Sequence, residues 1–150
     1  MSCNVAFIGL GVMGYPMAGY ISKGGHNVTV FNRTKSKAEK WIKEYKGKMA
    51  ETPAEAAKDA EYVFTCVGND NDLREVTFGD NGAFKTIKKG AIYIDNTTAS
   101  ATIAREIFEQ KKHENDKSIV TKKAKLKIFM SSIFFPAQIN KKLLSNVADA

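Results

Sequence analysis

The sequence of 150 residues contains few cysteines and prolines and no long apolar run. Only Cys3 and Cys66 are present and their placement suggests no disulfide framework, so we expect a reducing compartment, the cytoplasm. Three prolines and eleven glycines exclude a collagen-like or low-complexity chain. No apolar stretch approaches the ~18 residues that a membrane-spanning helix requires. The start, Met1 to Asn4, lacks a basic segment that leads into an apolar one, so neither a signal peptide nor a membrane partner is predicted.

Acidic residues are fewer than basic ones, and the excess of positive charge is unevenly placed. The net charge is +7; residues 1–113 carry 16 Lys and Arg against 13 Asp and Glu, and residues 114–150 carry seven against three. A basic chain can bind nucleic acid or an anionic small molecule. Because the first 113 residues are nearly neutral, we expect no nucleic-acid partner. A phosphate-bearing small molecule needs only a few well-placed cations.

Apolar patterns alternate between those of strands and those of helices over the first 113 residues. Val5 to Ile8 is a short apolar run stopped by glycine, typical of a strand buried on both faces. Further strands are predicted at 27–31, 49–50, 61–67 and 91–95, and helices at 16–23, 36–45, after Thr52, at 72–77 and after Ser100. This alternation favours right-handed βαβ units and a parallel sheet covered on both faces, in one α/β domain over residues 1–112. Residues 113–150 are predicted to be a divergent, irregular basic tail with room for one helix or one strand, near 128–130.

Two helix starts carry capping signals. Thr52 is the predicted N-cap of one helix, with Glu55 as its capping-box partner three residues later. Ser100 is the predicted N-cap of the last helix. The apolar residues of that helix recur at helical spacing and are expected to share one buried face: Ile103, Ala104, Ile107 and Phe108.

A glycine-rich turn lies between the first strand and the first helix. It reads Gly9-Leu10-Gly11-Val12-Met13-Gly14 and satisfies G-x-G-x-x-G in the strand–turn–helix context that gives this pattern its meaning. Gly9 permits the tight turn, Gly11 has no Cβ to obstruct an approaching pyrophosphate, and Gly14 lets the helix pack close to the strand. The N–H groups at the helix start then hold the phosphates of a dinucleotide, as in a Rossmann-like doubly wound sheet. The alternative is a glycine-rich turn that binds nothing.

The residues after the second strand select the dinucleotide. A site for NAD or FAD usually has Asp or Glu there, which accepts hydrogen bonds from the ribose hydroxyls. This chain has Asn32, Arg33 and Thr34 instead. A carboxylate would repel a 2′-phosphate, whereas Arg33 can bind it through two charged hydrogen bonds, aided by Thr34 and by Lys35 or Lys37. We predict NADP(H) in preference to NAD(H); the alternative is that Arg33 is a solvated surface cation.

Two later strand ends are expected to line the same crevice, because ligands of such sheets lie at the carboxyl ends of strands. Val67 and Gly68 would pass over the nicotinamide ribose. Asp72 either caps the following helix or bonds the ribose, and both alternatives stay open. The polar loop of residues 95–100 is either a structural turn or a functional loop that offers hydroxyls and amides to a carboxamide or a substrate carboxylate. In the second case its Thr97 and Ser100 are candidate substrate contacts.

Other residues with chemical potential carry weaker signals. His26 and His113 lie in a turn and a polar run, and both are expected to be solvated. Cys66 lies in a predicted buried strand, where a thiol is usually inert. Trp41 at helical spacing is expected to be core or half-buried surface. No spacing of His, Cys, Asp and Glu resembles a metal site, so no metal is predicted.

Three motifs, taken in order, resemble the β-hydroxyacid dehydrogenase family. This family includes 3-hydroxyisobutyrate dehydrogenase, tartronate semialdehyde reductase and the coenzyme domain of 6-phosphogluconate dehydrogenase. Residues 7–18, including Met13 and Met17, are similar to its opening signature, and residues 32–34 to the form of its second strand associated with NADP. Residues 95–100 are similar to its substrate-and-cofactor loop, in which Thr98 aligns with a hydroxyl that contacts the cofactor.

The resemblance implies hydride transfer between NADP and a small 3-hydroxy acid or its semialdehyde, with a lysine that handles the hydroxyl proton. Family members continue with a glycine-rich substrate loop and a helical domain that closes the active site and forms the dimer. Here no glycine follows Gly90, and no lysine from Lys117 to Lys142 lies in a matching motif, so no catalytic residue is assigned. We expect a cofactor domain truncated before the catalytic domain, with negligible turnover. The alternative is a dinucleotide-binding module without turnover, such as a sensor or the product of a disrupted gene; the oligomeric state is not predicted.

Overall fold

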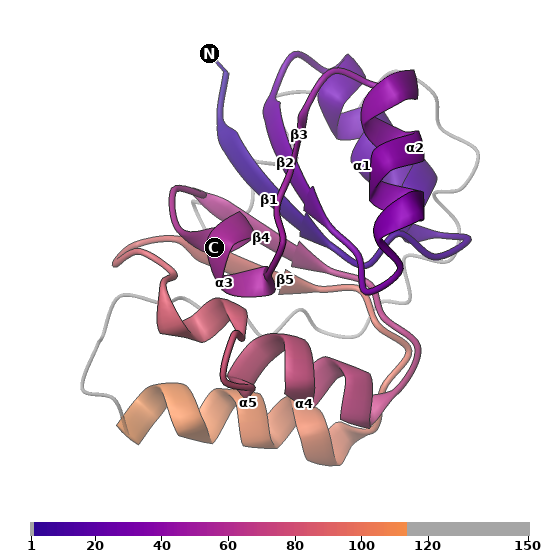
Figure 1. The fold of residues 1–150 in the computed structure, drawn as a ribbon. Helices are drawn as coiled ribbons and strands as arrows, with labels where there is room; N and C mark the ends of the chain where they lie inside the picture. The colour runs from indigo at the N-terminus through magenta and orange to yellow at the C-terminus, as the bar shows by residue number, and fades with distance from the viewer. Residues whose placement is uncertain (1, 114–150) are drawn as a thin grey trace.

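The computed structural model describes residues 2–113, which form a five-stranded parallel sheet with helices on both faces (Figure 1). The strand order is β3-β2-β1-β4-β5, and the strands are β1 (Asn4–Ile8), β2 (Asn27–Phe31), β3 (Lys48–Met49), β4 (Tyr62–Thr65) and β5 (Ile92–Asp95). The helices are α1 (Gly14–Lys23), α2 (Lys35–Glu44), α3 (Pro53–Ala57), α4 (Asp70–Phe78), the short 3-10 helix η1 (Ala83–Lys85) and α5 (Ala101–His113). This architecture confirms the predicted Rossmann-like doubly wound fold.

The central strand β1 aligns the ends of its neighbours. It pairs in parallel with β2 on one side and β4 on the other, and only Asn4 of its five residues is exposed. At the carboxyl end, Ile8 lies opposite Phe31 of β2 and Thr65 of β4, and Thr65 lies opposite Asp95 of β5. The loops that follow β1, β2, β4 and β5 therefore leave the sheet at the same edge.

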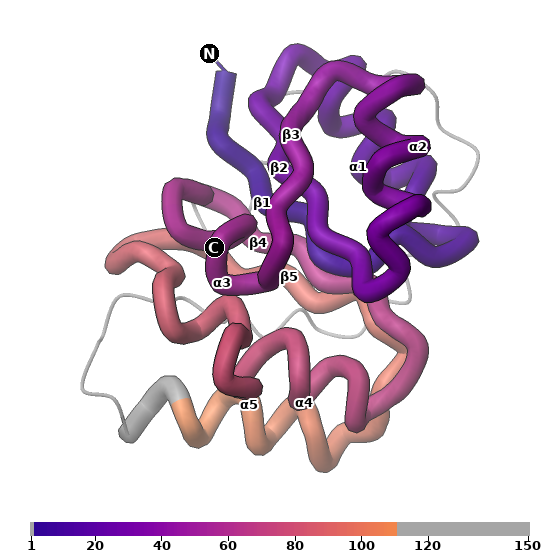
Figure 2. The backbone as a smooth tube through the Cα atoms, in the orientation of Figure 1, coloured from indigo at the N-terminus to yellow at the C-terminus, as the bar shows by residue number. Residues whose placement is uncertain are grey.

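Two apolar cores flank the sheet, because side chains of a strand alternate between its faces. Alternate residues of β1 enter opposite cores, Val5 and Phe7 on one face and Ala6 and Ile8 on the other. Trp41 lies fully buried in the first core, and its indole N–H donates to the carbonyl oxygen of Tyr15 at 3.1 Å. Leu73 and Ile103 lie in the second core. The backbone trace shows α1 and α2 on one side of the sheet and α4 and α5 on the other (Figure 2).

The helix ends differ in detail from the prediction. α1 begins at Gly14, before the predicted start at Pro16. Thr52 caps α3 as predicted, because its hydroxyl oxygen accepts from the N–H of Glu55 at 3.0 Å. The prediction of a full capping box is wrong for Glu55, because its carboxylate accepts from the N–H of Glu51 at 2.7 Å instead of from the N–H of the N-cap. The Glu55 carboxylate therefore binds the residue before the N-cap and fixes the direction in which the chain enters α3.

The last helix buries a narrower face than predicted. Ser100 caps α5 as predicted, because its hydroxyl oxygen accepts from the N–H of Ile103 at 3.3 Å. Ile103 and Ile107 are buried, whereas Ala104 is exposed and Phe108 is 51% exposed. The shared apolar face was therefore predicted wrongly for Ala104 and Phe108, since a single i, i+4 row faces the core.

His113, the first residue of the predicted tail, is the last residue of α5. The rest of the predicted tail, with its predicted strand near 128–130, lies outside the described residues. Within residues 2–113, the structure contains no helix that is both long and apolar enough to cross a membrane.

Candidate functional site

The glycine-rich turn closes tightly over the ends of β1 and β4. Gly9 has a φ of +100°, and its N–H donates to the carbonyl oxygen of Phe31 at 2.9 Å. A Cβ at Gly9 would lie 2.3 Å from the carbonyl oxygen of Cys66, and a Cβ at Gly14 would lie 2.0 Å from the carbonyl oxygen of Gly9. At both positions the glycine packs directly against another stretch of main chain. The turn therefore has no room for a side chain at Gly9 or Gly14.

The start of α1 presents unpaired main-chain donors. Among the described residues, the N–H groups of Gly11, Val12, Met13 and Gly14 have no hydrogen-bond partner, and Met13 at the N-cap supplies no side-chain cap. A Cβ at Gly11 would have nothing within 4 Å, and Val12 is 93% exposed. A helix start with free N–H groups and a partial positive charge binds anions well. The open space at Gly11 leaves these donors accessible to an anionic ligand.

Asn32 and Leu10 hold the turn to the end of β2. The Asn32 side-chain oxygen accepts from the N–H of Leu10 at 2.8 Å, and its amide donates to the carbonyl oxygen of Thr34 at 3.0 Å. The side chain of Leu10 is buried. Both residues were predicted to contact the cofactor. In the structure the N–H of Leu10 and the side chain of Asn32 bond to each other and so hold the turn in place.

The cations after β2 are exposed. The side chain of Arg33 is 84% exposed, and its Nη1 lies 2.7 Å from Oδ1 of Asp72. Lys35 pairs with Glu51 at 2.6 Å, whereas Lys37 is exposed beside Thr34, the N-cap of α2. Arg33, Thr34 and Lys37 therefore lie together where the adenosine ribose of a dinucleotide is predicted to bind.

The loop after β4 contains a helix cap that the sequence did not identify. Asn69 is the N-cap of α4, because its side-chain oxygen accepts from the N–H of Asp72 at 2.9 Å. The alternative that Asp72 caps this helix is therefore wrong. Asp72 occupies the first turn of α4 instead, where its Oδ2 accepts from the Asn69 amide at 3.1 Å. A Cβ at Gly68 would lie 2.9 Å from this oxygen, so the absent side chain leaves room for the carboxylate.

The loop after β5 is tied to the loop after β4. The carboxylate of Asp95 accepts from the hydroxyl of Thr65 at 2.8 Å and from the N–H of Thr97 at 3.0 Å. The hydroxyl oxygen of Thr97 accepts from the N–H of Val67 at 3.1 Å. Thr98 follows and is exposed. The two loops form one connected rim at the carboxyl end of the sheet, and Thr98 is an exposed residue of this rim.

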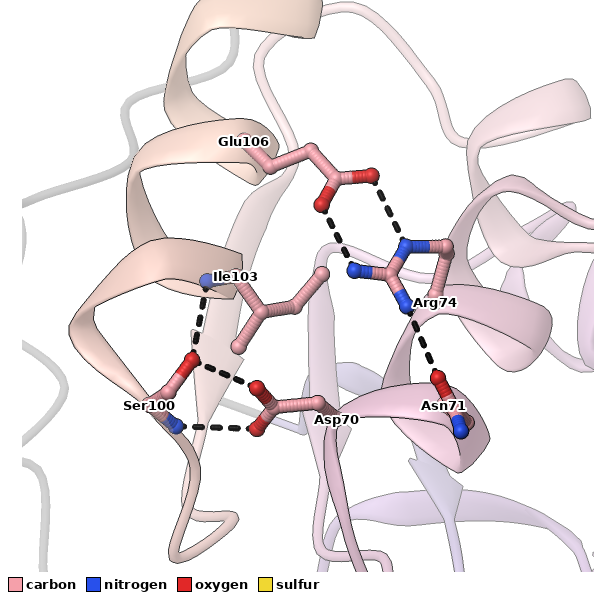
Figure 3. Close-up of polar contacts among 6 residues, drawn as sticks. All are labelled: Asp70, Asn71, Arg74, Ser100, Ile103 and Glu106. Carbon is pink, nitrogen blue, oxygen red and sulfur yellow. Dashed lines mark hydrogen bonds and ion pairs between the residues drawn. The ribbon is translucent and has the colours of Figure 1, made fainter.

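Ser100 is bonded to α4 as well as to its own helix (Figure 3). Its N–H donates to the carboxylate of Asp70 at 2.9 Å, and its hydroxyl donates to the same carboxylate. These two hydrogen bonds lower the pKa of Asp70 below its ordinary value, and the bond from the Ser100 hydroxyl has the larger effect. Asp70 is therefore ionised at neutral pH. Arg74 and Glu106 add a bidentate ion pair between α4 and α5 at 2.8 and 2.9 Å (Figure 3). Ser100, a predicted substrate contact, thus has its hydroxyl engaged in the junction of two helices, and sequence reasoning missed Asp70 because its partner lies 30 residues away.

The remaining candidates are structural. Cys66 was predicted to lie within a buried strand, but β4 ends at Thr65 and Cys66 follows it half-buried. Burial raises the pKa of its thiol, which lowers the reactivity of a cysteine. His26 was predicted to be solvated, but it is half-buried and its Nδ1 accepts from the N–H of Cys3 at 3.3 Å. In the part of the chain that the structure describes, no group of three His, Cys, Asp or Glu residues could hold a metal ion.

Comparisons with known proteins place this geometry among oxidoreductases. A family model described as the NAD binding domain of 6-phosphogluconate dehydrogenase matches residues 4–120. An uncharacterized oxidoreductase of Shewanella frigidimarina is 59% identical over 104 residues, which cover 69% of this chain and 36% of that protein. The structure of Mycobacterium tuberculosis 3-hydroxyisobutyrate dehydrogenase with L-serine has a TM-score of 0.68 and 26% identity, over 75% of this chain and 38% of that one.

A further solved structure, Psf3 in complex with NADP+ and 2-OPP, has a TM-score of 0.64 and 25% identity, over 71% of this chain and 39% of that one. The chain thus spans little more than a third of the length of each of these three proteins.

Proposed function

Since the chain belongs to the family of the NAD-binding domain of 6-phosphogluconate dehydrogenase, we propose that it binds NADP(H) in preference to NAD(H). It is the NAD(P)-binding domain of an oxidoreductase similar to 3-hydroxyisobutyrate dehydrogenase. The observation that carries the preference is the exposed guanidinium of Arg33 after β2, where a site for NAD has a carboxylate. The complex of the structural neighbour Psf3 with NADP+ supports the same preference.

The residues at the carboxyl end of the sheet would each hold a different part of the dinucleotide. Gly9 to Gly14 would hold the pyrophosphate, with the free N–H groups from Gly11 onward as donors. Residues 32–34 and Lys37 would hold the adenosine ribose and its 2′-phosphate, chiefly through the Arg33 guanidinium. The nicotinamide half would lie along the rim formed by Val67, Gly68 and Thr98. Asp72 was predicted to bond the nicotinamide ribose, but its carboxylate pairs with Arg33 and would therefore lie on the adenosine side. Thr97 and Ser100, in the loop after β5, would be the contacts to the substrate.

The preference is tested with the variant Arg33→Glu, which replaces the phosphate-binding cation by an anion. We expect its affinity for NADPH to fall about tenfold or more, because a charged hydrogen bond is lost and a repulsion is added. Its affinity for NADH should stay the same or rise, since a carboxylate accepts hydrogen bonds from the ribose hydroxyls. Cofactor fluorescence titrations of both dinucleotides measure the two affinities.

The matched control is Arg105→Glu, which makes the same change of charge at an exposed position on α5. It should leave the ratio of the two affinities unchanged. An unchanged preference in Arg33→Glu would remove Arg33 from the site.

The reaction that we propose for the whole enzyme is hydride transfer between NADP and a small 3-hydroxy acid or its semialdehyde. Bound NADP(H) would supply or accept the hydride. The 150-residue chain contributes the cofactor site, whereas no glycine follows Gly90 to form the family's substrate loop and no lysine lies in the family's catalytic motif. Positioning of the substrate against the nicotinamide is a large part of the rate, so the chain by itself should be catalytically incomplete.

We therefore expect the purified chain to bind NADPH and to show negligible oxidation of small 3-hydroxy acids. A fluorescence titration measures the binding, and absorbance at the nicotinamide band measures the turnover with NADP and a panel of hydroxy acids. Robust turnover would contradict the proposal that the chain supplies the cofactor site and is catalytically incomplete. The cytoplasmic location remains a prediction.

A further inference from the structure

The ion pair between Arg33 and Asp72 joins two sides of the proposed dinucleotide site. Arg33 follows β2, and Asp72 lies in the first turn of α4, after β4. In the sheet, β2 and β4 lie on either side of β1. The 2.7 Å contact between Arg33 and Asp72 therefore spans the carboxyl end of β1, where the glycine-rich turn begins.

The carboxylate of Asp72 is fixed by its own helix turn. Its Oδ2 accepts from the amide of Asn69 at 3.1 Å, and its N–H donates to the oxygen of the same side chain at 2.9 Å. The missing side chain of Gly68 leaves the space that Oδ2 occupies. The side chain of Asp72 is 24% exposed, and its Oδ1 accepts from Arg33, which lies outside the turn. Asp72 is thus a preplaced negative charge.

The Arg33 guanidinium, by contrast, has Asp72 as its one hydrogen-bond and ion-pair partner among the described residues. This is the group proposed to bind the 2′-phosphate of NADP(H). A carboxylate at 2.7 Å neutralises part of the guanidinium charge and repels an arriving phosphate. NAD(H) has a hydroxyl in place of this phosphate and meets no such repulsion, and a carboxylate is the acceptor that ribose hydroxyls usually find in NAD sites.

We propose that Asp72 is a specificity-determining residue that competes with the 2′-phosphate for Arg33 and so brings the affinities for NADP(H) and NAD(H) closer together. The proposal rests on the proposed function, namely that the crevice binds a nicotinamide dinucleotide with Arg33 at the 2′ position. Sequence rules place the discriminating carboxylate at the end of the second strand. Here the carboxylate reaches the same guanidinium from the helix after β4.

The test is the ratio of the dissociation constants of NADH and NADPH in the variant Asp72→Asn. The variant keeps the shape of the side chain and the N–H that binds Asn69, and removes the charge. We expect the ratio to rise about fivefold, the upper range for breaking an ion pair at the protein surface. Most of the rise should come from tighter NADPH binding. Asp72→Ser, measured in parallel, should raise the ratio as well, and thermal melting shows whether each variant is folded.

The matched control is Asp80→Asn, which removes one negative charge from an exposed position beyond α4 and should leave the ratio unchanged. In an Arg33→Ala background, Asp72→Asn should change the ratio much less, since no guanidinium is left for which Asp72 and the 2′-phosphate could compete. An equal rise in both backgrounds would overturn competition at Arg33, and so would an unchanged or lower ratio in folded Asp72→Asn and Asp72→Ser. In these cases the wild-type chain still binds NADPH, whereas a wild-type chain that binds neither dinucleotide would overturn the proposed function itself.

Discussion

Replacing Gly11 by valine should weaken NADPH binding about a hundredfold or more, because the side chain blocks hydrogen bonds from several main-chain donors to the pyrophosphate. A Cβ at Gly11 meets nothing within 4 Å in the free chain. The valine methyl groups would therefore extend into the space from which the pyrophosphate approaches the N–H groups of Gly11 to Gly14. The same open space means that the fold should tolerate the substitution, with a change in the free energy of unfolding of about 0.5 kcal/mol or less.

Fluorescence titration with NADPH and chemical denaturation of the same samples measure both parts of this prediction. Gly11→Ala is the graded control, which adds one methyl group and should weaken binding less than valine does. If Gly11→Val bound NADPH as tightly as the wild-type chain, the phosphates would lie elsewhere than at the start of α1.

Replacing Gly9 by alanine should instead destabilise the fold, by roughly 3 kcal/mol, since the new methyl group adds both backbone strain and overlap with main chain. The φ of +100° is unfavourable for any residue with a side chain. The Cβ would also lie 2.3 Å from the carbonyl oxygen of Cys66, which follows β4 and cannot move without disturbing the sheet. Chemical denaturation measures the loss.

Gly25→Ala separates the two causes. Gly25 has a φ of +88°, but a Cβ there would have nothing within 4 Å. Its substitution should cost only the strain, about 1–2 kcal/mol. Gly9→Ala must be clearly more destabilising than this control, and equal losses would mean that the turn does not press against the end of β4.

The strands and the turn were predictable because their signals are local. The apolar runs, the glycine pattern and the polar residues after each strand lie within a few positions of the elements that they define, as at Val5 to Ile8 and Gly9 to Gly14. The residue types after β2 likewise indicate a phosphate-binding cation without knowledge of the fold. Helix ends were less predictable: Asn69 and Asp72 are both good capping residues, and only the backbone geometry of α4 decides between them.

The sequence by itself determined the parallel α/β sheet, the glycine-rich turn and the cation after the second strand. Only the tertiary structure decided which groups in the site are already engaged. Asn32 bonds Leu10 across 22 positions, Ser100 bonds Asp70 across 30, and Arg33 pairs with Asp72 across 39. These contacts arise because the parallel order β2-β1-β4-β5 brings distant loops to one edge of the sheet, and a pattern of neighbouring residues contains no record of that distance.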